Sequence, residues 1–374
     1  MKVVYIYEGL PAYRKDFFVL LNDRLKKEGH DLLILYGRKN ANESLQLSEN
    51  LGFDAKSFPV KTYIKKGPLK FIGFLGLVRY FKSKSPDVYV LQFHVSTLTY
   101  WRLYIYSKLN NIPYITWDCN YLKPELGRRA RSLRKYLTDK VYKNAKVCVT
   151  YGTKFKNELL QICKNEKDII VAQNTINIEK IYSNRSELCN NKHFDHPLHI
   201  LYVGVVNDRK NVEAAIIAVA ELIKEGHNIY FDIVGGGDSY DNCATLAKNL
   251  DVTDRVVLHG PKYSTELQYY FENADVFVLP GTGGLAINEA MAYSLPIIST
   301  EGDGTILDLI DGNGYLLKNN GDVSELKNAI LNFIRLPEEE KKKMSKKSED
   351  IILKKASLEN MVNQHIIAIK RVLE

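Results

Sequence analysis

Three glycines occupy four consecutive positions within LPGTGGLAINEAMAYSLPII, residues 279–298. The apolar run 275–281 predicts a strand, and residues 285–294 predict a helix directly after it. Glycine lets the backbone approach a ligand closely, and the free N–H groups of a first helical turn attract anions. The turn therefore predicts a phosphate or pyrophosphate site. Its residues are Gly281, Thr282, Gly283, Gly284, Leu285 and Ala286.

Glu289 lies about one turn inside the predicted helix. A carboxylate at this place can accept hydrogen bonds from sugar hydroxyls, as the acid of a dinucleotide-binding fold does for ribose. It is a poor ligand for phosphate, so we expect a ribose as its partner. The alternative is a tight turn followed by an acid that only complements the helix dipole. These residues alone favour neither interpretation.

Short β-rich runs alternate with amphipathic helical segments along the chain. The predicted strands are 2–7, 31–37, 87–93, 113–117, 146–152, 199–205, 229–237, 255–260, 275–281 and 296–300. The predicted helices include 14–28, 98–109, 127–143, 210–225, 264–273 and 285–294. This alternation predicts βαβ units, and the near-continuous apolar strands predict mostly parallel sheets covered on both faces.

The alternation stops in a polar, aperiodic stretch and then restarts. We therefore predict an α/β protein with two Rossmann-like, doubly wound domains facing a central cleft, over residues 1–178 and 197–355, joined by a linker at 179–196. The amphipathic segment 356–374 predicts a helix that packs back on the first domain. Ligands of such sheets bind outside the carboxyl ends of the strands, so each domain is expected to hold one substrate.

The composition agrees with two globular domains, because a chain of 374 residues with 45% hydrophobic content is longer than a domain with a single hydrophobic core usually is. A formal charge of +8 suits anionic partners. No recognised nucleic-acid-binding motif appears, so no nucleic acid is expected. Five scattered cysteines predict a reducing compartment. The start has no signal-peptide pattern, and the apolar run 71–78 is too short to span a bilayer, so a cytoplasmic protein is expected.

The glycine-turn stretch resembles the donor-site motif of GT-B glycosyltransferases of family 4, a large retaining group. That motif has a Glu, seven residues, a second Glu and then A-M-A-x-G-x-P. The matching residues are Glu289, Ala290, Met291, Ala292 and Pro296. Ser294 stands where Gly is usual, and Gly281 stands where the family has its first Glu. The resemblance associates that first Glu with the donor sugar's hydroxyls and Glu289 with the ribose.

The stretch YVGVVNDRKNVEAAI, residues 202–216, extends the resemblance. Lys210 matches a lysine that family members direct at the donor diphosphate, where positive charge stabilises the leaving group. The Arg that usually follows the glycine falls on Val205. Arg209, next to Lys210, is a candidate for partial compensation in the donor site, although helical phasing points it elsewhere. The alternative for Lys210 is an ordinary exposed lysine.

Residues 233–267 also follow the family's order. The resemblance implies that the backbone at Gly235 lines the cleft and that the loop near His259, Gly260 and Tyr263 surrounds the base. His259 by itself is more often a structural histidine.

Residues 301–326 match the family's last conserved segment. We interpret Gly302, Asp303 and Gly304 as turn residues rather than ligands.

In the first half, Gly9 follows the first strand and resembles the glycine where family members let the acceptor or transferred sugar approach. Tyr13 and Arg14 begin the next helix and are expected to face the mouth of the cleft. The alternative for this segment is a capping turn.

Residues 113–121 lie where many family members carry a histidine that contacts the transferred sugar. The candidates here are Asp118, Cys119 and Asn120. Asp118 is expected to bind a sugar hydroxyl or the acceptor, and Cys119 is expected to stay a neutral thiol because no nearby motif would lower its pKa. His94 is a further acceptor-site candidate at a strand's carboxyl end.

Two basic segments, 127–143 and 61–84, mix Lys and Arg with aromatic and aliphatic residues. Both are suited to an anionic membrane surface, where each basic residue adds about 1 kcal/mol. A lipid-linked acceptor would fit such a surface. The alternative is a solvated helix face that covers its own sheet.

The resemblance implies a retaining glycosyltransferase that moves a sugar from a UDP- or GDP-linked donor to a glycan hydroxyl, in surface polysaccharide or lipid-linked glycan synthesis. Lys210 supplies charge at the diphosphate, so neither a metal nor a cofactor is expected. One alternative is a catalytically inactive relative acting as a scaffold or partner subunit, because of Gly281, Val205 and the missing histidine. Another is a GT-B epimerase that needs no acceptor.

Overall fold

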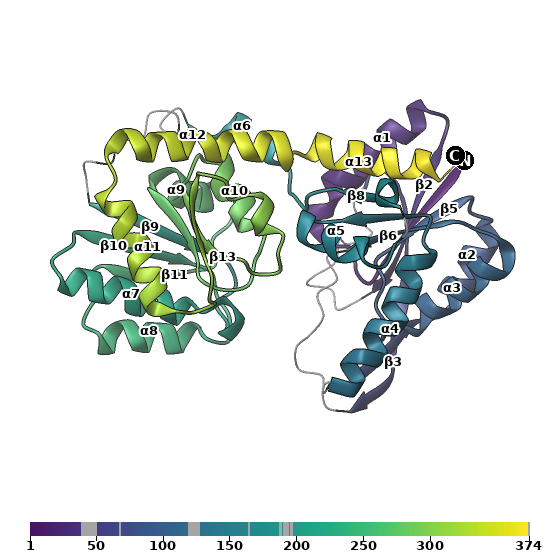
Figure 1. Cartoon of the computed structure of the whole chain (residues 1–374), viewed down its shortest axis with the longest axis horizontal. Helices are drawn as coiled ribbons and strands as arrows, with labels where there is room; N and C mark the ends of the chain where they lie inside the picture. The colour runs from purple at the N-terminus through teal and green to yellow at the C-terminus, as the bar shows by residue number, and fades with distance from the viewer. Residues whose placement is uncertain are drawn as a thin grey trace. The chain divides into compact units, whose positions relative to one another are not determined.

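The structure is a computed structural model that describes residues 1–38, 51–66, 69–118, 128–163, 165–186, 189, 194 and 197–372 (Figure 1). The chain forms two compact units. Unit 1 comprises Met1–Gln173 and Leu358–Glu374, and unit 2 comprises Asn174–Ser357. Each unit is an α/β sheet flanked by helices, which confirms the predicted fold class of two Rossmann-like domains.

Unit 1 contains an eight-stranded sheet in the order β4-β3-β2-β1-β5-β6-β7-β8. All neighbouring strands are parallel except β3 and β4, which form an antiparallel pair. The strands are β1 Lys2–Tyr7, β2 Asp31–Arg38, β3 Asp54–Lys66, β4 Leu69–Phe74, β5 Val88–Leu91, β6 Tyr114–Asp118, β7 Val147–Thr150 and β8 Ile169–Val171.

The helices of unit 1 cover both faces of this sheet. They are α1 Lys15–Lys27, α2 Leu77–Lys84, α3 Leu98–Asn110, α4 Arg128–Asn144, α5 Thr153–Leu160 and α13 Leu358–Arg371. Successive residues of a strand point to opposite faces. Tyr5 of β1 therefore packs in the core beneath α1 and α13, whereas Ile6 packs in the core beneath α2 and α3. Helix α13 lies along α1, so the chain's last helix belongs to unit 1 (Figure 1).

Unit 2 contains a six-stranded, fully parallel sheet in the order β11-β10-β9-β12-β13-β14. The strands are β9 Leu198–Val203, β10 Ile229–Val234, β11 Val256–Gly260, β12 Val276–Leu279, β13 Ile297–Thr300 and β14 Gly314–Leu317. The helices are α6 Ile178–Asn184, α7 Val212–Lys224, α8 Tyr240–Asn249, α9 Ser264–Asn273, α10 Ala286–Ala292, α11 Val323–Arg335 and α12 Glu338–Lys355.

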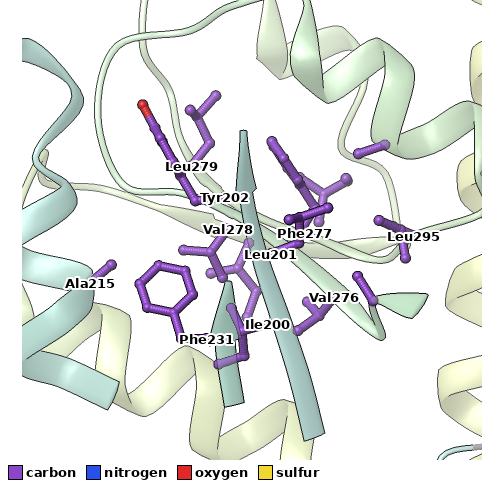
Figure 2. Packing of buried hydrophobic residues seen from close by; sticks show 14 of the residues in the cluster. Ile200, Leu201, Tyr202, Ala215, Phe231, Val276, Phe277, Val278, Leu279 and Leu295 are labelled. Carbon is purple, nitrogen blue, oxygen red and sulfur yellow. The ribbon is translucent and has the colours of Figure 1, made fainter. Parts of the chain in front are cut away.

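The central strands of unit 2 are buried on both faces. Every residue of β12 is buried, and Figure 2 shows these side chains in one cluster with Ile200 and Tyr202 of β9 and Phe231 of β10. A parallel sheet covered by helices has no solvated face, which explains the continuous apolar run in this part of the sequence. The result is a rigid platform for the loops at the strands' carboxyl ends.

The boundary between the units differs from the predicted linker at 179–196. Helix α6 and the residues after it belong to unit 2. Arg185 forms a buried ion pair with Glu349 of α12, with 3.0 Å between Nη2 and Oε2. Arg185 also donates to the Ser294 hydroxyl at 2.8 Å. A polar, aperiodic segment can thus be fixed by a few buried polar contacts that no hydrophobic period reveals.

The hairpin β3–β4 was not among the predicted strands. Residues 54–59 of β3 pair with β2, whereas the later part of β3 pairs with β4 alone. Most side chains in that later part are exposed, so an apolar alternation is absent. In the described part of the chain, no helix has the length and apolar character needed to cross a membrane.

Candidate functional site

The strand order of unit 2 reverses between β9 and β12. The chain leaves β9 toward β10 and β11 on one side, and continues from β12 toward β13 and β14 on the other. Ligands of open parallel sheets bind at such a switch point, outside the carboxyl ends of the strands. Lys210 lies in the loop after β9, and Gly281 to Gly284 lie in the loop after β12. The topology thus brings together two segments that are 70 residues apart in the sequence.

These two loops bind each other directly. The Thr282 backbone N–H donates to the Arg209 carbonyl at 2.9 Å, and the Thr282 hydroxyl is 3.2 Å from the same oxygen. A Cβ added at Gly281 would lie 2.3 Å from the Arg209 carbonyl oxygen and 2.6 Å from the Lys210 Cα. Glycine at 281 is therefore required by the close approach of two backbones. The carboxylate that the resembling motif has at this position cannot be placed here without moving a loop.

Lys210 is buried beneath the glycine turn. It ends a short 3-10 turn at Asp208–Lys210, and only 9% of its surface is exposed. Its Nζ donates to the carbonyl oxygens of Thr282 and Gly283 at 2.6 and 2.5 Å. Burial and, to a smaller extent, the neighbouring Arg209 lower the pKa of Lys210, Asp303 raises it, and the net pKa is about 8. Among the described residues, no carboxylate lies within ion-pair distance of this ammonium group, so its charge is available to an anionic ligand.

Glu289 is a partly buried carboxylate on α10. The described residues provide its side chain with no hydrogen bond or ion pair. Burial raises the pKa of Glu289 to about 7. Strongly shifted groups at a ligand-binding edge are typical of functional sites, because a structural carboxylate is normally paired. Lys210 and Glu289 are thus two uncompensated groups of opposite charge in the loops and helix that follow β9 and β12.

Access to the glycine turn is uneven along its length. Thr282, Gly283 and Leu285 are partly exposed and Gly284 is exposed, whereas Gly281 is buried. The side chain of Ala286 is also partly exposed, and α10 then turns into the core at Ile287. Residues 282 to 286 can therefore contact a ligand, and Gly281 acts as the packing point beneath them.

Ser294, two residues after the end of α10, is one departure from the motif. Ser294 has a φ of +58°, in the left-handed region that favours the glycine usual at this place. Its hydroxyl compensates, because it accepts from Arg185 and donates to Glu349 at 3.0 Å. Burial raises the pKa of Glu349, but hydrogen bonds from Lys346, Arg185 and Ser294 together outweigh it and lower the pKa to about 2. The end of α10 is thereby fixed to α6 and α12.

Asp303 was interpreted as a turn residue, but the structure brings it to the site. It follows β13, the strand beside β12. A Cβ added at Gly283 would lie 3.4 Å from Asp303 Oδ1, and Asp303 raises the pKa of Lys210. The only sequence signal for this role is the position of Asp303 directly after an apolar strand.

The loops after β10 and β11 lie on the other side of the switch point. Gly235 has a φ of +142°, and a Cβ there would lie 1.8 Å from the Gly204 carbonyl oxygen. Its N–H donates to the Gly260 carbonyl at 2.9 Å. Gly235 therefore permits close packing of strand ends. Tyr263 is 74% exposed beyond β11 and is free to stack on a flat ligand.

His259 and Arg209 differ from their neighbours in the predicted donor site. His259 Nε2 is 2.6 Å from Asp232 Oδ1, and its ring packs against Tyr270 with 4.6 Å between centroids. These partners within the sheet and α9 give His259 a structural role. Arg209 is exposed, with no side-chain hydrogen bond among the described residues, and can add positive charge beside Lys210. Val205, where the motif has an arginine, is also exposed.

The acceptor-site candidates lie in unit 1, where the strand order reverses between β1 and β5. Gly9 follows β1, and His94 follows β5 with partial exposure. Tyr13 is exposed. These residues follow the strands on either side of this switch point, and their role in binding an acceptor stays a prediction.

Arg14 was expected to face the mouth of the cleft, but it is buried. Only 1% of it is exposed, and its guanidinium carbon lies 4.8 Å from the centroid of the Trp117 ring. It donates to the Tyr151 hydroxyl at 3.3 Å and contacts the Met361 sulfur of α13 at 3.6 Å. A planar guanidinium can pack among aromatic rings, so Arg14 contributes to the core of unit 1 rather than to an open acceptor site.

Asp118 is likewise buried, with 5% exposure at the end of β6. The Tyr142 hydroxyl donates to its carboxylate at 2.6 Å. Asp118 is therefore held inside unit 1 by α4. Cys119 and Asn120 lie outside the described residues. Within the described ranges, no group of three or more His, Cys, Asp and Glu side chains is arranged to hold a metal ion.

The second unit of the chain is similar in sequence to known proteins. Residues 185–351 match the family model described as Glycosyl transferases group 1. Known relatives include the amylovoran biosynthesis glycosyltransferase AmsK of Erwinia amylovora, 32% identical over 185 residues that cover 46% of this chain and 42% of the relative. The putative colanic acid biosynthesis glycosyltransferase WcaL of Escherichia coli is 29% identical over 182 residues, covering 46% and 43%. The match thus spans less than half of either relative.

Solved structures are similar over the whole chain. A glycosyltransferase from Rickettsia africae has a TM-score of 0.73 at 16% identity and covers 100% of this chain and 98% of its own. HepE from Anabaena, solved in complex with UDP, has a TM-score of 0.74 at 16% identity and covers 99% and 100%. The chain therefore has the GT-B glycosyltransferase fold, and its second unit matches the group 1 family. This confirms the GT-B fold that the resemblance implies, and membership of family 4 stays a prediction.

Proposed function

We propose that the chain is a retaining glycosyltransferase of family 4 that transfers a sugar from a nucleoside diphosphate sugar to a hydroxyl of a glycan. The observation that carries the proposal is the buried Lys210 ammonium, which lies under the glycine turn without a carboxylate partner. A diphosphate fits this place, because it supplies the negative charge that no carboxylate of the described residues provides to Lys210. The solved complex of HepE with UDP and the polysaccharide-synthesis names of AmsK and WcaL support the same class of reaction.

In the proposed reaction, the bond between the anomeric carbon and the diphosphate oxygen breaks, and its electron pair stays on the diphosphate. The acceptor oxygen bonds to the same face of the anomeric carbon, and its proton passes to the departing phosphate oxygen. Lys210 and the N–H groups of residues 283 to 286 stabilise the charge that develops on the diphosphate. Because Lys210 supplies this charge, we expect transfer to continue in EDTA. The Glu289 carboxylate anchors the ribose.

We further propose that the acceptor is lipid-linked and that unit 1 meets an anionic membrane from the cytoplasmic side. On the β3–β4 hairpin, Tyr63 and Ile64 are exposed between Lys61 and Lys65. On α4, Leu133 and Tyr136 are exposed among basic residues. Apolar side chains flanked by lysines favour the interface of an anionic bilayer. Sedimentation with phosphatidylglycerol vesicles tests this, and binding should fall with salt and with a Lys61→Ala/Lys65→Ala double variant.

The donor site is tested by thermal unfolding with UDP, GDP, ADP, CDP and dTDP. A ligand at 100 times its Kd adds roughly 2.7 kcal/mol to the free energy of unfolding. We expect stabilisation by one nucleotide, reduced in Lys210→Ala and Glu289→Gln. Lys248→Ala is the matched control, because Lys248 is an exposed lysine on α8 of the same unit.

Stabilisation that is equal in wild type and in both site variants would show that the nucleotide binds somewhere other than at this loop. No stabilisation by any of the five nucleotides at millimolar concentration would contradict the donor site. That result would favour an inactive relative with a scaffold role, which the absence of a side chain at Gly281 also allows.

A further inference from the structure

The loop after β13 places a carboxylate beside the glycine turn. A Cβ added at Gly302 would lie 2.8 Å from the backbone nitrogen of Gly283, so the two loops are in close backbone contact. Asp303 Oδ1 lies 3.4 Å from the position that a Cβ of Gly283 would take. Side chains larger than glycine at 283 would therefore occupy the space in front of Asp303.

One oxygen of Asp303 is held and the other is free. Oδ1 accepts hydrogen bonds from the Thr305 N–H at 3.1 Å and from the Thr305 hydroxyl at 2.6 Å. Among the described residues, Oδ2 has no hydrogen-bond partner, and the side chain is partly exposed. A carboxylate with one fixed and one open oxygen is suited to accept a hydrogen bond from a ligand without losing rotamer freedom at binding.

Asp303 and Lys210 flank the same two glycines. Lys210 Nζ binds the Gly283 carbonyl and lies 3.2 Å from the position that a Cβ of Gly284 would take. The two charges are near enough for Asp303 to raise the pKa of Lys210, yet they form no ion pair. When an anionic group binds at Lys210, the chemical group covalently attached to that anion would therefore lie close to Asp303, which is a hydrogen-bond acceptor.

Resting on the proposed function, we propose that Asp303 accepts hydrogen bonds from hydroxyls of the transferred sugar and so determines which donors are used. It would supply the sugar-binding carboxylate that cannot be carried at Gly281, where a side chain would overlap the backbone of residues 209 and 210. A fixed negative charge at the sugar selects neutral sugars with free hydroxyls. It disfavours uronic acids, whose own carboxylate would be repelled.

The test is calorimetric titration of wild type, Asp303→Asn and Asp303→Ala with UDP, UDP-glucose and UDP-glucuronate, or with the corresponding pair for the nucleotide that stabilises the protein most. Hydrogen bonds to a charged group predict a roughly 10- to 100-fold loss of UDP-glucose affinity in both variants. The affinity for UDP should change by about twofold or less. Asp311→Asn is the matched control, because it removes the same charge from an exposed position nearby in the chain.

A gain of binding makes the outcome independent of folding defects. If Asp303 repels uronic acids, Asp303→Asn binds UDP-glucuronate more tightly than wild type does, which a damaged protein cannot do. An unchanged ratio of UDP to UDP-glucose affinity in Asp303→Ala would overturn the inference while leaving the proposed function intact. Equal weakening of both ligands would also overturn it, since Asp303 would then act on the diphosphate through Lys210. Failure of wild type to bind any nucleotide would instead refute the proposed function.

Discussion

The two units present the same kind of sheet edge but use charge there in opposite ways. In unit 1, the charged residues near the switch point are enclosed: Arg14 lies among aromatic rings and Asp118 is bound by Tyr142. In unit 2, Lys210, Glu289 and Asp303 surround a glycine turn without neutralising one another. Charges that are paired or packed stabilise a fold, whereas charges left uncompensated at a strand end are available to a ligand.

The two units also differ in the size of the side chains at their strand ends. The strand ends of unit 1 are filled by Tyr7, Trp117 and Tyr151, which pack edge to face around Arg14. The strand ends of unit 2 carry glycines at 204, 235, 237 and 281, and their backbones nearly touch. Bulky rings thus fill the strand ends of unit 1, whereas glycines let neighbouring backbone segments of unit 2 approach each other closely.

The largest effect is expected for a pair of arginines, one from each unit. Arg14→Ala removes a side chain that is 1% exposed and should lower the free energy of unfolding by roughly 2–5 kcal/mol, the range for a large buried deletion. Arg209→Ala removes an exposed side chain and should change it by less than about 0.5 kcal/mol. Urea unfolding of both variants measures this. Nucleotide affinity should fall more in Arg209→Ala than in Arg14→Ala. A loss of nucleotide affinity in fully folded Arg14→Ala would contradict this difference between the two units.

Lys210→Met should separate function from stability within unit 2. Loss of a preorganised charge at the leaving group predicts a roughly 100- to 1,000-fold lower kcat. Stability should not fall, because burial of this ammonium is unfavourable, as its lowered pKa of about 8 shows. The two readouts are donor turnover and urea unfolding at pH 7. A stability loss equal to that of Arg14→Ala would show that Lys210 has a structural role instead.

Two glycine variants test why the turn lacks side chains. Gly281→Ala forces a Cβ to 2.3 Å from the Arg209 carbonyl oxygen, so a loss of roughly 1–3 kcal/mol is expected, together with weaker nucleotide binding. Gly312→Ala has open space around its Cβ but a φ of +74°, so only about 1 kcal/mol should be lost, with no effect on binding. Thermal unfolding with and without nucleotide distinguishes a backbone clash from conformational strain.

The smallest effect is a pH dependence of donor binding. Glu289, with a pKa raised to about 7, becomes a charged hydrogen-bond acceptor as the pH rises through 7. Lys210, with a pKa lowered to about 8, loses its charge as the pH rises through 8. Affinity for a nucleoside diphosphate sugar should therefore be greatest between about pH 7 and 8 and fall by at most about tenfold per pH unit outside this window.

Single variants assign the two limbs of this profile. Glu289→Gln should remove the fall on the acid side, and Lys210→Met should remove the fall on the alkaline side. A diphosphate sugar is the suitable ligand, because its diphosphate has no terminal group that titrates in this range. An identical profile in Glu289→Gln would show that this carboxylate does not contact the ligand.

Much of the fold could be predicted because the unit 2 strands are continuous apolar runs and the helices have a regular apolar period. The predicted helix at 264–273 coincides with α9, and the one at 98–109 with α3 apart from one residue. The hairpin β3–β4 could not be predicted in the same way. Its outer part pairs with one neighbour and is solvated, so its sequence has no apolar alternation that would mark a buried face.

The site was predictable as a segment but not residue by residue. The glycine turn and Glu289 are recognisable from their place between a strand and a helix. The sequence pair Arg209–Lys210 does not reveal which cation is buried, since a short 3-10 turn decides it. Asp303 resembles an ordinary turn residue between two glycines, and only the pairing of β13 with β12 places it beside Gly283.

The amino-acid sequence by itself determined the alternation of strands and helices, the doubly wound α/β class and the glycine turn that joins β12 to α10, because these depend on local period and on backbone freedom. The tertiary structure alone decided which charges are enclosed and which remain open. Burial, hydrogen-bond partners and shifted pKa values arise between segments distant in the sequence, as between Lys210 and Gly283 or Arg14 and Met361.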